Sequence, residues 1–92
     1  MIRSFKDSDT EKVWNLTYVK RFSNEIAKKA REKLQIIDAA ESVNDLRVPP
    51  GNRLEKLKGD RASQYSVRVN DQWRICFTWN DGAEGVEICD YH

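Results

Sequence analysis

Residues 65–92 read YSVRVNDQWRICFTWNDGAEGVEICDYH, three short runs of β-branched and aromatic residues separated by Asn-Asp and Asp-Gly. Val67 and Val69 alternate with Arg68, and every second residue of the next run is apolar: Trp73, Ile75, Phe77 and Trp79. A period of two is typical of strands with one buried face, and the two dipeptides favour turns. We therefore predict an antiparallel meander whose middle strand places Arg74, Cys76 and Thr78 on the polar face.

The alternation also predicts how the strands pair. The valines share a face with the tryptophan run only if Val69 lies opposite Trp73, which leaves residues 70–72 as a three-residue turn. In the second hairpin Asp81-Gly82 marks the turn. The apolar pattern then predicts four pairs: Trp79 with Val86, Phe77 with Ile88, Cys76 with Cys89, and Arg74 with Tyr91. The last pair would place a guanidinium beside a phenol, next to His92, the only histidine.

The first half of the chain predicts a strand and two helices. Residues 2–5 alternate like a short strand, and Ser8-Asp9-Thr10-Glu11 has the spacing of a capping box, so we expect a first helix there. A second helix is predicted after Ser23, a favourable N-cap residue. One helical face is apolar (Ile26, Ala30, Leu34 and Ile37), and Lys28, Lys29, Arg31 and Lys33 lie elsewhere on the helix. Such a helix ordinarily covers a sheet, and a partner-binding surface is the alternative.

The second helix is expected to end near residues 42–45. A loop is predicted over 47–52 because Pro49 and Pro50 lack amide donors, and a weak, bulged strand is predicted over 53–57. Residues 58–61 form the expected turn into Tyr65. The sequence thus predicts one domain over 1–92, of α+β class, with an N-terminal strand and two helices on one face of a small, largely antiparallel sheet.

Composition predicts an ordinary soluble protein, with 34% charged and 39% hydrophobic residues. No apolar run approaches the length of a membrane span, and the first residues lead into no signal peptide, so we expect a cytoplasmic protein without a membrane partner. In that compartment Cys76 and Cys89 are interpreted as small hydrophobic residues rather than a bridge. If the two face each other, a disulfide is geometrically possible under oxidation.

Charge is unevenly distributed although the net charge is only +1. Residues 53–74 contain six basic and three acidic residues, whereas residues 75–92 contain four acidic residues and no Lys or Arg. A basic strip beside an acidic strand can hold a phosphate backbone, and a solvated face of alternating charge is the plainer interpretation. The candidate RNA contacts in this strip are Arg53, Lys56, Arg61 and Arg68.

The polar face of the meander carries side chains that suit RNA cleavage. No metal or cofactor is predicted, because one histidine and two cysteines cannot form an ordinary zinc site and the glycines form no phosphate-binding loop. Cleavage requires that the 2′-hydroxyl lose a proton, that negative charge on the phosphoryl oxygens be stabilised, and that the leaving oxygen be neutralised. Histidine, tyrosine and glutamate can move protons, and arginine can stabilise the charge. The plain alternative is an exposed strand arginine with a tyrosine in the core or at an edge.

Three segments carry a family resemblance: PGNRLEKLKGDR (50–61), YSVRVNDQWR (65–74) and the closing DYH (90–92). Together with the opening MIRSF they resemble the HigB branch of the RelE-type toxins, the killer components of bacterial type II toxin–antitoxin pairs. The resemblance implies a RelE-like microbial-ribonuclease fold and an endoribonuclease that enters the ribosomal A site and cuts messenger RNA. It also implies a neutralising helix-turn-helix antitoxin of the HigA type, and a complex that binds operator DNA through the antitoxin.

The resemblance also assigns roles by position. It matches Arg74 to a transition-state arginine and Lys58 to a lysine at the phosphate. The positions matched to a carboxy-terminal trio associated with activity are Asp90, Tyr91 and His92. Glu55 stands where some members have a catalytic histidine, and a glutamate can accept a proton but cannot stabilise anionic charge. The resulting hypothesis is that His92 or Tyr91 serves the 2′-hydroxyl, Arg74 and Lys58 bind the phosphate, and Asp90 orients a neighbour.

Two other classes of function fit parts of the sequence. The same basic strip could serve a non-catalytic RNA- or ribosome-binding module, or the protein could act through a complex with a helical partner. A binding module needs aromatic residues on the open face to stack on bases. Here the tryptophans of the meander fall on the apolar side, and Tyr65 shares the parity of Val67, so the sequence favours the enzyme.

Overall fold

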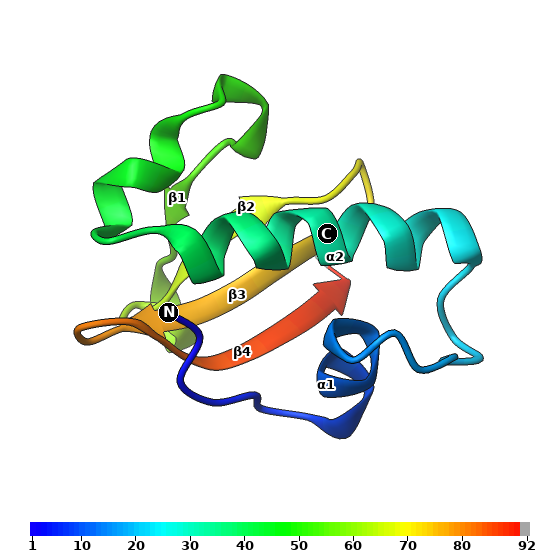
Figure 1. Cartoon of the computed structure of the whole chain (residues 1–92). Coiled ribbons are helices and arrows are strands. Elements are labelled where there is room, and N and C mark those ends of the chain that lie inside the picture. Colours follow the sequence, from blue (N-terminus) through cyan, green and yellow to red (C-terminus); the bar gives the residue numbers. More distant parts are fainter. Residues whose placement is uncertain (91–92) are drawn as a thin grey trace.

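The computed structural model of the protein describes residues 1–90. Two helices, α1 and α2, precede four strands that form one antiparallel sheet in the order β1-β2-β3-β4, and α2 crosses one face of it (Figure 1). The bounds are α1 Ser8–Trp14, α2 Asn24–Ala39, β1 Glu55–Lys56, β2 Tyr65–Arg68, β3 Trp73–Trp79 and β4 Ala83–Asp90. Short 3₁₀ turns lie at Val43–Arg47, Pro50–Asn52 and Gly59–Arg61. The predicted α+β architecture is confirmed.

The core lies between α2 and the sheet. Ala30, Leu34 and Ile37 of the predicted apolar face are fully buried, and Ile26 is partly buried beside them. They pack with Val67, Ile75, Phe77, Val86 and Ile88, all from one face of the sheet. Ser23 is the N-cap of α2, as predicted, since its hydroxyl accepts from the Ile26 amide at 3.2 Å.

The predicted start of α1 is wrong by one residue. Asp7, not Ser8, is the N-cap, and its carboxylate accepts from the Thr10 amide at 2.7 Å. Asp7 has the extended backbone of a cap residue, and its carboxylate is also favoured by the helix dipole. Thr10 is then placed so that its hydroxyl accepts from the Ile88 amide at 3.0 Å, which ties α1 to β4.

The N-terminal strand exists only as two isolated bridges. Ile2 pairs with Ala83 and Phe5 with Val86, both parallel to β4. Between the two bridges the amide of Gly85 donates to the Ser4 hydroxyl at 2.8 Å rather than to a backbone carbonyl. Gly85 has a positive φ of 59°, which a glycine adopts without strain, so the backbone of β4 turns away from the ladder at this point.

The first hairpin has the predicted register. Val67 pairs with Ile75 and Arg68 with Arg74, and the Val69 amide donates to the Trp73 carbonyl at 2.9 Å. The side-chain carbonyl of Asn70 accepts from the Trp73 amide at 2.7 Å and so closes the three-residue turn.

The second hairpin does not have the predicted register. Trp79 pairs with Ala83, Cys76 with Glu87, and Arg74 with Cys89, so the three predicted pairs that lie within residues 1–90 do not form. The connection is a tight loop in which Asp81 and Gly82 both have positive φ, followed by a bulge between Cys76 and Thr78. One extra residue of β4 is accommodated there, and this keeps both Ala83 and Val86 in the core. Tyr91, the predicted partner of Arg74, lies outside the described residues.

The segment between α2 and β2 matches the prediction in outline. The loop over 47–52 starts at the last residue of the 3₁₀ turn Val43–Arg47 and contains the 3₁₀ turn Pro50–Asn52. The weak strand over 53–57 is the two-residue β1, and the turn into Tyr65 is the 3₁₀ turn at Gly59–Arg61. Within residues 1–90, neither helix is long and apolar enough to cross a membrane.

Candidate active site on the open face of the sheet

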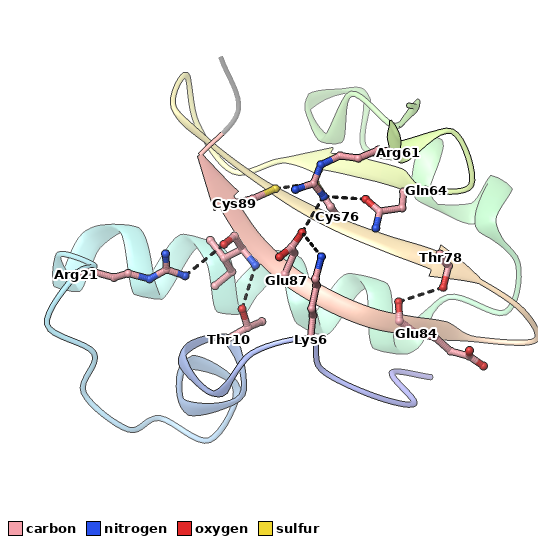
Figure 2. A network of polar contacts seen from close by, with 11 residues as sticks. Lys6, Thr10, Arg21, Arg61, Gln64, Cys76, Thr78, Glu84, Glu87 and Cys89 are labelled. Atoms are coloured by element: carbon pink, nitrogen blue, oxygen red, sulfur yellow. Dashed lines mark hydrogen bonds and ion pairs between the residues drawn. The ribbon is translucent and has the colours of Figure 1, made fainter. Parts of the chain in front are cut away.

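The sheet face turned away from α2, here called the open face, carries the polar positions of the strands. Ser66 of β2, Arg74 and Cys76 of β3, and Glu87 and Cys89 of β4 all belong to it, opposite in parity to the core residues. Figure 2 shows this face with α2 behind the sheet. The predicted assignment of Arg74 and Cys76 to the polar face is therefore correct.

Arg74 is held rigidly although it carries a full charge. The residue is only 9% exposed, its Nε donates to the Ser66 hydroxyl at 2.8 Å, and its Nη2 donates to the backbone carbonyl of Arg53 at 2.7 Å. Ser66 is itself fully buried. Hydrogen bonds of a charged donor are stronger than neutral ones, and two of them fix the plane of the guanidinium before any ligand arrives.

The Arg53 carbonyl is positioned by the loop that follows α2. Arg53 adopts a left-handed backbone conformation with φ of 44°, directly after the buried Asn52. The Asn52 amide donates to the carbonyls of Leu46 and Val48, and its oxygen accepts from Lys33 Nζ of α2 at 2.5 Å. Lys33 of α2 thus supports the loop that anchors Arg74.

Glu55 provides a carboxylate beside the guanidinium. It lies on β1 opposite Ser66, and its Oε2 is 3.8 Å from Arg74 Nη2. The Glu55 side chain is 51% exposed, so at this distance the ion pair is weak and a phosphate can compete for the arginine. A proton acceptor and a fixed cation therefore lie side by side at the edge of the open face.

The remaining predicted cations divide into two groups. Arg53, Lys56 and Lys58 are exposed along β1 and its flanks, and Lys56 Nζ lies 5.8 Å from the ring centroid of the partly buried Tyr65. Arg68, on β2, forms an ion pair with Asp71 in the turn. Arg53, Lys56 and Lys58 are neighbours of Glu55 in the sequence. Arg68 lies at the end of β2, away from Ser66, the residue opposite Glu55.

Arg61 belongs to a separate network on the open face (Figure 2). Its guanidinium donates to Glu87 at 2.7 Å and to Gln64 at 2.8 Å, and Lys6 Nζ lies 3.7 Å from the same Glu87 oxygen. The hydrogen bond to Glu87 raises the pKa of Arg61 above its usual value. The Arg61 side chain is already bonded to Glu87 and Gln64. Its contact with RNA stays a prediction.

The carboxy-terminal candidates are only partly described. Asp90 is the last described residue, exposed at the end of β4, where it pairs with Trp73 and accepts from Gln72 Nε2 at 3.2 Å. Tyr91 and His92 lie outside the described residues, so their predicted roles in proton transfer stay predictions.

Two thiols meet on the open face. Cys76 Sγ and Cys89 Sγ are 2.7 Å apart, and both cysteines are free. The hydrogen bond from Cys89 lowers the pKa of the Cys76 thiol, and the nearby Arg61 and Arg74 guanidinium groups act in the same direction. The same hydrogen bond and burial raise the pKa of Cys89. The sequence predicted their proximity through the wrong register, because they are diagonal rather than direct neighbours.

Two important residues were not singled out in the sequence. Ser66 could have been found from its parity, since it alternates with Val67 on the strand beside Arg74. Glu87 has the same parity signal, since it lies between Val86 and Ile88, but its partners come from residues 6 and 61 and only the fold brings them together. Among residues 1–90 no group of three or more His, Cys, Asp and Glu side chains is arranged to hold a metal ion.

Comparison with known proteins identifies relatives along the whole chain. The family model described as "RelE-like toxin of type II toxin-antitoxin system HigB" matches residues 3–92. Toxin HigB-1 of Vibrio cholerae is 48% identical over 60 residues, which are 65% of this chain and 63% of that protein, so the match spans less than two thirds of its length. Endoribonuclease HigB of Proteus vulgaris is 31% identical over 97 aligned positions that cover both chains completely.

Solved structures share the fold. The YoeB–YefM complex from Staphylococcus aureus contains a chain that superposes with a TM-score of 0.65 at 22% identity, covering 100% of this chain and 98% of that one. The YoeB dimer from the same species gives a TM-score of 0.62 at 25% identity, covering 99% and 94%.

Proposed function

The chain belongs to the HigB family of RelE-like toxins of type II toxin–antitoxin systems, and from that premise we propose that it is a ribosome-dependent endoribonuclease that cuts messenger RNA. The observation that carries the proposal is Arg74, a nearly buried guanidinium whose orientation is fixed by Ser66 and by the Arg53 carbonyl. A pre-oriented cation of this kind is what phosphoryl transfer requires, because negative charge develops on the phosphoryl oxygens in the transition state.

The roles follow from the chemistry of each side chain. Arg74 and Lys58 bind the scissile phosphate, and Glu55 accepts a proton; its position 3.8 Å from Arg74 Nη2 supports this role. His92 or Tyr91 serves the 2′-hydroxyl, and Asp90 orients a neighbour. In this scheme the cations stabilise the charge, so the step uses no metal ion or cofactor.

The partners belong to the same proposal. The full-length relative named Endoribonuclease HigB supports RNA cleavage, and the YoeB–YefM complex supports pairing with an antitoxin. We infer that a HigA-type helix-turn-helix antitoxin neutralises this protein and carries the complex to operator DNA. The toxin released from it acts in the cytoplasm on messenger RNA in the ribosomal A site.

The test compares Arg74→Ala with Arg68→Ala on programmed ribosomes. The two arginines are direct partners across β2 and β3, but only Arg74 is buried and fixed, whereas Arg68 pairs with Asp71. Wild type should cut ribosome-bound message and leave free RNA intact. Arg74→Ala should lower kcat by about 10²–10³-fold, the usual cost of removing a group that stabilises an oxyanion. Arg68→Ala should chiefly raise KM.

Two outcomes would overturn the proposal. A folded Arg74→Ala variant that keeps the wild-type kcat would remove the arginine from the mechanism. Wild-type protein that binds ribosomes but leaves every message intact would instead be a module that blocks the A site without cutting.

A further inference from the structure

The thiol pair on the open face has no part in the proposed cleavage step. Cys76 lies on β3 and pairs with Glu87, while Cys89 lies on β4 and pairs with Arg74, so the two cysteines are diagonal neighbours on the same face. Their sulfur atoms are 2.7 Å apart. This separation is only about 0.7 Å longer than a disulfide bond. The side chains already lean toward each other across the ladder.

We propose that Cys76 and Cys89 are a redox modification site, where a peroxide forms an intramolecular disulfide that suppresses RNA cleavage. The existence of the disulfide is independent of the protein's activity. Its effect on cleavage rests on the proposed function.

The surroundings favour reaction of this pair. A thiolate is the reactive form of cysteine. Arg61 and Arg74 both stabilise negative charge at Cys76, while Glu87 opposes it and is itself neutralised by Arg61 and Lys6. The hydrogen bond between the two sulfurs lets the remaining thiol stabilise the thiolate. Cys76 is fully buried, but Cys89 is partly exposed and gives a small oxidant access to the pair.

The chemistry is a two-step oxidation with two electrons transferred. One thiolate of the pair attacks a peroxide oxygen, the O–O bond breaks, and the departing hydroxide takes up a proton to leave as water. The resulting sulfenic acid is then attacked by the second sulfur. The S–O bond breaks, a second water leaves, and the S–S bond forms. Two thiols and one hydrogen peroxide thus give one disulfide and two waters.

The disulfide would act on Arg74 through the sheet. Diagonal residues of an antiparallel pair have Cα atoms about 7–8 Å apart, while bridged cysteines usually lie at about 4.4–6.8 Å. Closing the bond therefore draws β3 and β4 together at Cys89, the ladder partner of Arg74. The Arg74 guanidinium then shifts relative to Ser66 and Glu55, which hold and flank it. A displacement of about 1 Å at a reacting centre can cost about 10²-fold in rate.

The first experiment tests the bond alone. Purified protein is treated with hydrogen peroxide, and intact mass and peptide mapping follow its two thiols. We expect the loss of two hydrogens, a peptide linking Cys76 to Cys89, and full reversal by dithiothreitol. Cys89→Ser, at the more exposed position, should form no internal bridge, and Cys76→Ser provides a second variant if the first fails to fold. Thiols that stay reduced, or that bridge only between molecules, would overturn the proposal.

The second experiment measures cleavage on programmed ribosomes by reduced and oxidised protein. Oxidation should lower the rate about 10²-fold, as expected for a displaced catalytic group, and dithiothreitol should restore it. Cys89→Ser should cleave at the reduced wild-type rate with or without peroxide. Equal rates for reduced and oxidised wild type would overturn the regulatory role. If reduced protein cuts nothing, the proposed function fails, while the mass measurement still decides whether the disulfide forms.

Discussion

Arg74 shows how one charged side chain can be buried and remain useful. Burying a charge is costly unless hydrogen bonds replace the lost water, and here a hydroxyl and a backbone carbonyl do so. The alternation of residues 73–79 was enough to place Arg74 on the polar face. It could not supply the Arg53 carbonyl, because a left-handed residue in a loop 21 positions away leaves no periodic signal.

Ser66→Ala should separate the orientation of Arg74 from its charge. Without the hydroxyl, the buried Nε loses its acceptor, so we expect unfolding to become easier by about 1–3 kcal/mol. The guanidinium keeps its charge but loses its fixed plane, and kcat should fall about 10²-fold with little change in KM. Urea unfolding and single-turnover cleavage measure the two effects.

Ser63→Ala is the matched control, since Ser63 is exposed three residues earlier in the chain. It should change neither quantity. If Ser66→Ala loses stability and yet cleaves at the wild-type rate, Arg74 does not need its serine in order to act.

Among the elements, β4 departs most from what the sequence predicts. The alternating apolar residues in 73–79 were enough to predict the register of the first hairpin. Only one turn length puts the apolar residues of both strands on the same face. In β4 the core positions Ala83 and Val86 are three apart, a spacing that no regular strand has. The sequence signal of a bulge at that point was the glycine at position 85, inside the strand pattern. In the structure its φ is positive.

The element-scale prediction concerns two glutamates of β4. Glu87 is 12% exposed and joins β4 to the N-terminal segment through Lys6 and to the turn before β2 through Arg61. Glu87→Gln should lower the free energy of unfolding by about 1–2 kcal/mol, because hydrogen bonds to charged groups are the stronger ones and this one is largely shielded from water. Chemical denaturation with a constant m-value is the measurement.

Glu84→Gln is the control on the same strand. Glu84 also lies 3.7 Å from a cation, Arg3, but both side chains are well exposed. Surface ion pairs contribute little, so the change should stay below about 0.5 kcal/mol. Equal losses for the two variants would mean that the network around Glu87 adds nothing beyond a surface pair.

For the whole molecule, the fold determines which cations of the basic strip have a carboxylate neighbour. The sequence shows a strip of six cations over 53–74, but three of them have carboxylate neighbours in the structure: Arg61 with Glu87, Arg68 with Asp71, and Arg74 with Glu55. Within residues 1–90 no carboxylate lies within ion-pair distance of Arg53, Lys56 or Lys58. Composition could predict the strip but not this selection, because Glu87 and Glu55, two of the three carboxylates, are far in sequence from their arginines and only Asp71 is a local partner.

The last prediction follows from that selection. If Lys56 contacts a phosphate, its replacement by alanine removes one released counterion, and the slope of log affinity against log salt should become shallower by about 0.7, the value for single-stranded RNA. Binding to programmed ribosomes over a series of KCl concentrations at fixed Mg²⁺ gives the slope. Lys29→Ala is the control, since Lys29 is exposed on α2, the helix on the opposite side of the sheet. A slope altered equally by both substitutions would show that RNA senses only the overall charge, whereas a change confined to Lys56 places the message along β1, beside Glu55 and Arg74.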